Sequence, residues 1–242
     1  YELSLSTVNV KTKDFRWVMD FNLAHNKSKI NRLNVRDNSY EPSREGYSVG
    51  AVFSLKTAGL DENGLQMFYN KQGEKVSFND FFGLEYGYMM GGLIPFLKSN
   101  LSAEEYRNLF TYEGTTEPKF TGGWINRFYY KNFDLTVSAS FVLDQTVQEQ
   151  PFYNPVQTSP GQNYSRRMSQ IWSPDNTSGK YPRIMGTYTE GEENWAYQWL
   201  GMLDPGNSYR KYDYWFKKMS YMRINSIRLG YTFPERLLGH IG

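Results

Sequence analysis

The chain of 242 residues contains no cysteine and only two histidines, His25 and His240. The absence of cysteine excludes disulfide frameworks, thiolate zinc sites and thiol nucleophiles. The net charge is only +2, from 27 Lys and Arg residues against 25 Asp and Glu residues. Because no basic cluster is present, a dedicated nucleic-acid binder is also excluded. We therefore expect no nucleic-acid partner, and two histidines leave little material for a metal site.

Long hydrophobic runs are absent as well. No stretch approaches the roughly 18 to 20 apolar residues that a membrane-spanning helix needs. Residues 1–10 alternate like a strand and lack the charged and apolar regions of a secretory signal. These absences exclude helical spanning only, because strands of about 10 residues with one apolar face also cross membranes. The aromatic content is high, at 17%, and fits a β-rich chain of one or two domains.

Two segments alternate with a period of two, which is typical of strands with one apolar face. In residues 15–23 and 133–143, apolar side chains occupy the odd positions and mostly polar ones the even positions. A third strand is predicted at 221–233, where Ile227, Leu229, Tyr231 and Phe233 form an apolar row in the second half. Weaker strand patterns lie at 2–10, 47–55, 65–78 (with a break at 70–73) and 124–130. These seven segments predict an all-β, antiparallel fold. One helix is expected at 102–110, where Ser102 and Glu105 have the spacing of a capping box.

The connections between these strands differ greatly in length. Residues 11–14 and 131–132 are tight turns, whereas residues 24–46 and 144–220 are long connections. Compact soluble domains rarely contain such connections, but outer-membrane barrels combine short periplasmic turns with long outer loops. Aromatic residues gather near the short turns, as in an interfacial girdle: Phe15, Trp17, Phe128, Tyr129, Tyr130, Phe133, Tyr231 and Phe233. The pattern favours a transmembrane β-barrel over a soluble sandwich with one solvated face.

Several segments resemble the SusC-like family of TonB-dependent outer-membrane transporters from Bacteroidetes. Residues 220–234, SYMRINSIRLGYTFP, are similar to the family's late-barrel signature. Shorter matches follow in family order: 14–17 with 21–30, 59–61 with Gly64, 118–124 with 130–135, and Trp172 with 181–183. The resemblance implies about seven strands of a larger, plugged barrel of about 22 strands. The family's plug, TonB-contacting box and final strands have no counterpart here, so we expect part of the C-terminal half, either a fragment or one piece of a split transporter.

The resemblance also implies a location and a function. The intact protein would lie in the bacterial outer membrane and would not be an enzyme. It would import a nutrient, expected to be an oligosaccharide with a peptide as the other option, together with a SusD-like surface lipoprotein. TonB would act through the plug region, and no cofactor is implied. Two alternatives stay open: a soluble carbohydrate-binding β-sandwich or propeller of a secreted glycan-processing protein, and a structural barrel without transport.

The alternating rows assign roles to particular residues. Outer-membrane lipid is expected to contact one row: Phe15, Trp17, Met19, Phe21, Phe133, Leu135 and Val137. The lumen is expected to be lined by the opposite row: Arg16, Asp20, Asn22 and Asp134. Rings and planar polar groups of the long connection suit glycans and peptides alike, and the candidates for ligand or partner contact are Tyr164, Arg166, Arg167, Trp172, Trp195 and Trp199. For any single ring, packing of the loop on itself is the competing interpretation.

Three patterns that suggest chemistry have simpler explanations. Residues 46–50 match G-x-S-x-G, yet the expected strand around Ser48 and the lack of a suitable histidine disfavour a nucleophile elbow. Residues 61–64 and 175–179 carry oxygen ligands that calcium prefers, but turn chemistry explains them without a bound ion. Adjacent glutamates, such as Glu104 and Glu105, point apart and predict no glycosidase pair. We therefore expect no catalytic and no metal-ligating residues, with a loop-bound calcium ion as the alternative.

Overall fold

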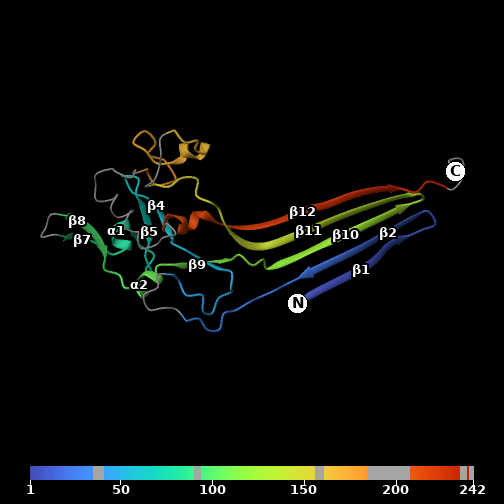
Figure 1. The fold of residues 1–242 in the computed structure, drawn as a ribbon, viewed down its shortest axis with the longest axis horizontal. Helices are drawn as coiled ribbons and strands as arrows, with labels where there is room; N and C mark the ends of the chain where they lie inside the picture. Colours follow the sequence, from blue (N-terminus) through green and yellow to red (C-terminus); the bar gives the residue numbers. More distant parts are fainter. Residues whose placement is uncertain (35–40, 90–93, 156–160, 185–207, 235–238, 240–242) are drawn as a thin grey trace.

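The computed structural model describes residues 1–34, 41–89, 94–155, 161–184, 208–234 and 239. Five long strands form one antiparallel sheet in the order β1-β2-β10-β11-β12. Their bounds are β1 Glu2–Lys11, β2 Phe15–Ala24, β10 Phe120–Tyr130, β11 Phe133–Gln148 and β12 Phe216–Tyr231. Figure 1 shows these strands side by side as an elongated sheet, with the shorter elements gathered beyond one end.

Two tight turns join neighbouring strands of this sheet. In the turn between β1 and β2, the Phe15 backbone N–H donates to the Thr12 hydroxyl at 3.1 Å. In the turn between β10 and β11, Lys131 adopts a positive φ of 51°. Both turns lie at the same end of the sheet, because Phe15 pairs with Tyr130 across β2 and β10. The long connections therefore all leave from the opposite end.

The short elements lie beyond that opposite end (Figure 1). Two antiparallel pairs are present, β3 (Ala51–Ser54) with β9 (Thr111–Thr115) and the hairpin of β7 (Leu84–Met89) with β8 (Ile94–Ser99). A three-stranded sheet consists of β4 (Thr57–Leu60), β5 (Gln66–Tyr69) and β6 (Lys75–Val76). The short helices are α1 (Phe78–Phe81), α2 (Ala103–Arg107) and the 3-10 helices η2 (Arg166–Gln170), η3 (Ser208–Lys211) and η4 (Asp213–Trp215). None of the helices in the described ranges has the length and apolar character needed to cross a membrane.

The hydrophobic core lies among the short elements and not under the long sheet. It is rich in rings, and its buried members are Leu55, Phe68, Phe78, Phe81, Phe82, Tyr106, Tyr153, Ile171, Tyr209, Tyr212 and Trp215. Among the described residues, Ala139 is the only buried apolar residue that the five-stranded sheet contributes. Nearly all the apolar side chains of the long strands thus remain outside the core.

The all-β antiparallel architecture predicted from the sequence is confirmed, but only five of the seven expected segments join the long sheet. The expected strand at 47–55 is wrong in its first half, because residues 47–50 turn, with the Ala51 N–H donating to Ser48 O at 3.1 Å. The segment 65–78 splits into β5 and β6, since the Asn70 side chain accepts from the Gln72 and Glu74 backbone N–H groups. The expected break at 70–73 is therefore confirmed.

The expected helix at 102–110 is present as α2, but it is shorter than expected. Its capping box is confirmed, because the Ser102 hydroxyl accepts from Glu105 N–H at 3.2 Å and the Glu105 carboxylate accepts from Ser102 N–H at 2.8 Å. The sequence reading missed the hairpin of β7 and β8, and it also missed α1. Helix α1 has its own cap, in which the Ser77 hydroxyl accepts from Asp80 N–H at 3.1 Å.

Candidate functional site

The register of the long sheet aligns the alternating rows of its strands. Phe15 in β2 lies opposite Tyr130 in β10, and Tyr130 lies opposite Phe133 in β11. Because side chains alternate along each strand, this pairing carries the odd positions of β2 and β11 to one face. All seven residues of the expected apolar row therefore share a face: Phe15, Trp17, Met19, Phe21, Phe133, Leu135 and Val137.

This apolar face continues onto the edge strand β12 and is bare there. Ile224, Ile227 and Leu229 pair with apolar-row positions of β11 and are 59%, 66% and 70% exposed. Within the described residues, no second sheet pairs with or buries this row. A contiguous apolar surface of this kind requires an apolar partner, because leaving it in water is unfavourable.

The polar side chain of Asn126 lies within the apolar face. Asn126 in β10 pairs with Met19 in β2 and with Val137 in β11. Its Oδ1 accepts a hydrogen bond from the indole Nε1 of Trp17 at 2.9 Å. The indole thus satisfies the amide oxygen without water, which suits an apolar environment.

The opposite face of the sheet is polar and internally paired. Arg127 in β10 forms an ion pair with Asp20 in β2, and the hydroxyls of Ser138 and Ser226 are hydrogen-bonded at 2.8 Å. A trough of about 790 Å³ runs along this face, and its polar lining includes Ser4, Ser6, Asp20, Asn22, Ser138, Ser140 and Asn225. Arg16 and Asp134, the other expected lumen residues, share this face with Asp20 and Asn22 by alternation.

Arg167 is the centre of a second arrangement, in the long connection. Its guanidinium lies 4.5 Å from the ring centroid of Phe152, and the rings of Tyr181 and Trp215 are also within 6 Å of it. Its Nη2 donates to the Tyr181 hydroxyl at 2.7 Å, and its Nη1 donates to the Glu149 carboxylate. Since both the planar face and the edge of the guanidinium are used within the chain, Arg167 organises the loop.

The charges around Arg167 reinforce each other. Hydrogen bonds from Lys217 and then Arg167 hold the pKa of the Glu149 carboxyl below its ordinary value. The hydrogen bond to Tyr181 and then the Glu149 carboxylate raise the pKa of the Arg167 guanidinium. Glu149 follows β11 and Lys217 lies at the start of β12, so this group joins the long connection to the end of the sheet.

The other candidates in the long connection have different settings. Trp172 packs inside the loop region: a Cβ added at Gly64 would lie 2.3 Å from its ring. Tyr164 is 37% exposed, and Arg166 is exposed at the start of η2, so these two side chains are open to contact from outside. Trp195 and Trp199 lie outside the described residues.

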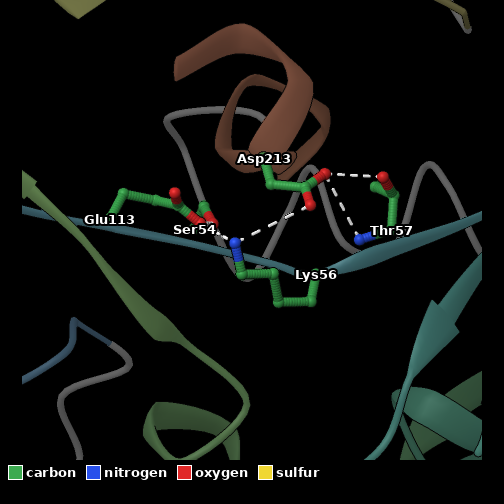
Figure 2. A network of polar contacts seen from close by, with 5 residues as sticks. All are labelled: Ser54, Lys56, Thr57, Glu113 and Asp213. Atoms are coloured by element: carbon green, nitrogen blue, oxygen red, sulfur yellow. Dashed lines mark hydrogen bonds and ion pairs between the residues drawn. The ribbon is translucent and has the colours of Figure 1, made fainter. Parts of the chain in front are cut away.

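A polar network fastens the end of the long connection to the short strands (Figure 2). The Asp213 carboxylate accepts from the Thr57 N–H at 3.3 Å, and its other oxygen lies 3.9 Å from the Lys56 ammonium. Lys56 also bonds Glu113 of β9, which in turn accepts from the fully buried Ser54 hydroxyl. Segments that are far apart in sequence are thereby joined directly before β12 begins.

Neither calcium candidate is arranged as an ion site. The Asp61 Oδ1 accepts backbone N–H groups from Asn63 and Leu65 at 2.9 and 2.7 Å, which is turn chemistry. The Asn176 amide donates to the carbonyl oxygens of Ser169 and Ile171. In the described part of the chain, no three His, Cys, Asp or Glu side chains come together in a way that could hold a metal ion. Ser48, in the G-x-S-x-G match, donates its hydroxyl to Thr115 Oγ1 at 2.8 Å.

Comparisons with known proteins agree with this geometry. No family model matches the chain. The chain is 26% identical over 260 aligned positions to TonB-dependent receptor P3 of Formosa agariphila, covering 100% of this chain and 22% of that protein. It therefore spans about a fifth of the length of this curated relative.

The fold is also similar to that of solved transporter structures. The RagAB peptide transporter has a TM-score of 0.61 at 18% identity, and the RagAB peptide importer in its closed-closed state has a TM-score of 0.63 at 18% identity. Each comparison covers 98% of this chain and 23% of the solved chain. These likenesses show that the chain has the antiparallel β fold of part of a barrel transporter.

Proposed function

We propose that this chain forms part of the barrel wall of a SusC-like TonB-dependent nutrient importer of the bacterial outer membrane, a proposal that its similarity to a TonB-dependent receptor and to the RagAB transporter structures supports. The observation that supports the proposal best is the pair of aligned rows. One face of the sheet is apolar and bare within the described residues, and the other is polar and paired. A barrel wall between lipid and a protein-filled lumen needs both faces.

The apolar face has the height that a bilayer requires. At the tight-turn end it finishes in Phe15, Tyr130 and Phe133, and at the other end the rings of Phe120 and His25 lie 5.0 Å apart. From residue 120 to residue 130 there are ten steps of ~3.3 Å, or ~33 Å of strand. With a strand tilt of ~40°, the vertical height is ~25 Å, which matches the apolar band of such barrels. We assign this face to lipid.

The polar face would then line the lumen. Its Asp20–Arg127 ion pair, and Asp134 with Arg228 at 3.9 Å, are cross-strand pairs of opposite charge. Such pairs keep charged side chains satisfied where a plug domain, and not bulk water, fills the interior. TonB would act through that plug and open a path along this wall, so no covalent chemistry is required of the chain.

The long connections would meet the substrate and a SusD-like lipoprotein. Tyr164 and Arg166 are exposed and lie next to Arg167, whose stacking fixes η2 in place. Rings and guanidinium groups on a fixed loop suit a sugar face or a peptide backbone. We propose an oligosaccharide as the substrate. A peptide is the second candidate, which the similarity to the RagAB peptide transporter favours.

Uptake by cells that express the intact protein tests this proposal. We expect import of either a labelled oligosaccharide mixture or a labelled oligopeptide mixture, and we expect it to stop when a protonophore removes the energy that TonB transmits. A matched strain without the protein provides the baseline. Import of neither class, import that survives the protonophore, or release of the protein from the envelope by salt alone would contradict the proposal.

A further inference from the structure

A second groove of about 770 Å³ lies just beyond the sheet, at the end from which the long connections leave. Residues 25–29, which follow β2, form one side of it. Residues 112–119, which lead into β10, form its middle, and Thr146 and Lys218 complete it from β11 and β12. The predicted ligand-binding residues that the structure describes, Tyr164, Arg166, Arg167 and Trp172, lie outside this lining.

The groove opens on the apolar side of the sheet. His25 continues the odd-numbered apolar row of β2, and its ring lies 6.3 Å from Tyr1 and 5.0 Å from Phe120. Ala24 of β2 and Thr121 of β10 lie at the same end of the sheet but on its opposite, polar face, and they line the trough there. The groove therefore begins where the apolar face ends in aromatic rings.

Lysines dominate the free charge of this groove. Two of its carboxylates are paired with lysines, because Glu113 bonds Lys56 and Asp144 lies 3.6 Å from Lys218. The Glu117 carboxylate accepts from the Ser28 hydroxyl at 2.8 and 3.1 Å and keeps its negative charge. Within the described ranges, the three other lysines of the lining form no salt bridge, and all three are exposed: Lys27, Lys29 and Lys119. Three exposed lysines against the Glu117 carboxylate leave an excess of positive charge in the groove, and the Lys119 ammonium lies 5.8 Å from the ring centroid of Phe120 at the end of the apolar face.

We propose that this groove binds the phosphorylated headgroup of an outer-leaflet glycolipid. The proposal rests on the assignment of the apolar face to lipid. The layer next to an aromatic belt is the headgroup layer, where lysines attract anionic lipid. One glycolipid molecule offers acyl chains to the apolar face, sugar to the rings of His25 and Phe120, and phosphate to Lys119 and its neighbours. A soluble anion would gain only the last of these contacts.

Native mass spectrometry of the intact protein in mild detergent tests the proposal with bisphosphorylated lipid A as the probe. The variant Lys27→Gln/Lys29→Gln/Lys119→Gln should bind it at least about tenfold more weakly. The control Lys13→Gln/Lys131→Gln, at the tight-turn end of the same sheet, should bind like the wild type. Dephosphorylated lipid A should bind weakly, and millimolar inorganic phosphate should not displace the glycolipid.

Two results would overturn the proposal: equal binding by the triple variant and the wild type, or equal binding of phosphorylated and dephosphorylated lipid A. Displacement by inorganic phosphate would show a plain anion site and would overturn the choice of glycolipid. Failure of the importer proposal is a separate result, because it shows as loss of energised uptake or as an apolar face that lipid does not reach. Normal uptake together with unchanged lipid binding by the triple variant would reject this inference alone.

Discussion

Trp17 donates its indole N–H to the amide oxygen of Asn126 across two neighbouring strands, at 2.9 Å, on the apolar face of the sheet. The two side chains depend on each other there. Without water, an amide that lacks a partner is costly, and an indole N–H needs an acceptor. The pair explains how one amide is accommodated among Met19, Val137 and their neighbours.

A double-mutant cycle measures this dependence. Trp17→Phe should lower the free energy of unfolding by about 1 kcal/mol when Asn126 is present, because the amide oxygen loses its donor. In an Asn126→Leu background, the same change should cost little. Urea unfolding of the protein in lipid vesicles provides the four free energies. Equal costs in the two backgrounds would show that the hydrogen bond contributes nothing.

A charge placed on the apolar face should be far more costly than one on the polar face. Val137→Arg should lower the free energy of unfolding by about 2–4 kcal/mol, because this position is expected to lie near the bilayer midplane. Ser138→Arg is the matched control, as the next residue in β11 with its side chain on the opposite face. Heat-modifiable migration and unfolding in vesicles report the two effects. Similar tolerance of both arginines would contradict the lipid assignment.

Gly64 and Gly73 form a matched pair for the packing of Trp172. Both have a positive φ, of 77° and 80°, so alanine should cost roughly 1–2 kcal/mol at either position. An added Cβ at Gly64 would also lie 2.3 Å from the Trp172 ring, whereas at Gly73 it would meet nothing within 4 Å. Gly64→Ala should therefore be the more damaging by about 1–3 kcal/mol.

Hydrogen exchange of residues 161–184 reports this difference. Adding Trp172→Ala to Gly64→Ala should remove the excess, because the clash is with the ring. If the two alanine variants exchange alike, Trp172 does not pack against Gly64 as described.

Acid should loosen the loop around Arg167. The pKa of Glu149 is lower in the folded chain than its ordinary value, so its ion pairs stabilise the loop above that ordinary value. This stabilisation is lost as the pH falls below about 4.5 and through the depressed folded-state pKa. Hydrogen exchange of η2 should accelerate over that window in the wild type. In Glu149→Gln, η2 should exchange faster at neutral pH, and the window should vanish; an unchanged acid response would contradict the role of Glu149.

The long strands could be predicted from the sequence because local alternation specifies them. In β2 and β11 the apolar and polar rows separate by position alone, and the register then aligns them. Residues 47–55 and 65–78 also alternate in part, but Gly46, Gly73 and the Asn70 side chain turn the chain, so tertiary packing among rings decides their fold. The sequence has no comparable signal for the small hairpin of β7 and β8.

The site was harder to predict, because its contacts join residues far apart in sequence. Arg167 was a candidate for ligand contact, and the structure places it against Phe152, Trp215 and Glu149, none of which lies near it in the chain. The Trp17–Asn126 bond spans 109 positions. The sequence signal for this bond is that Asn126 is a polar residue in an otherwise apolar row of β10.

The alternation of lipid contact along β11 tests the central claim most directly. Because this chain has no cysteine of its own, single cysteines that carry spin labels can be placed at Leu135, Thr136, Val137 and Ser138 without competing sites among its residues. In lipid vesicles, collisions with oxygen should be frequent at Leu135 and Val137 and rare at Thr136 and Ser138. Equal accessibility at all four positions, or greater oxygen contact at Thr136 and Ser138, would contradict a sheet that stands between lipid and a protein-filled lumen.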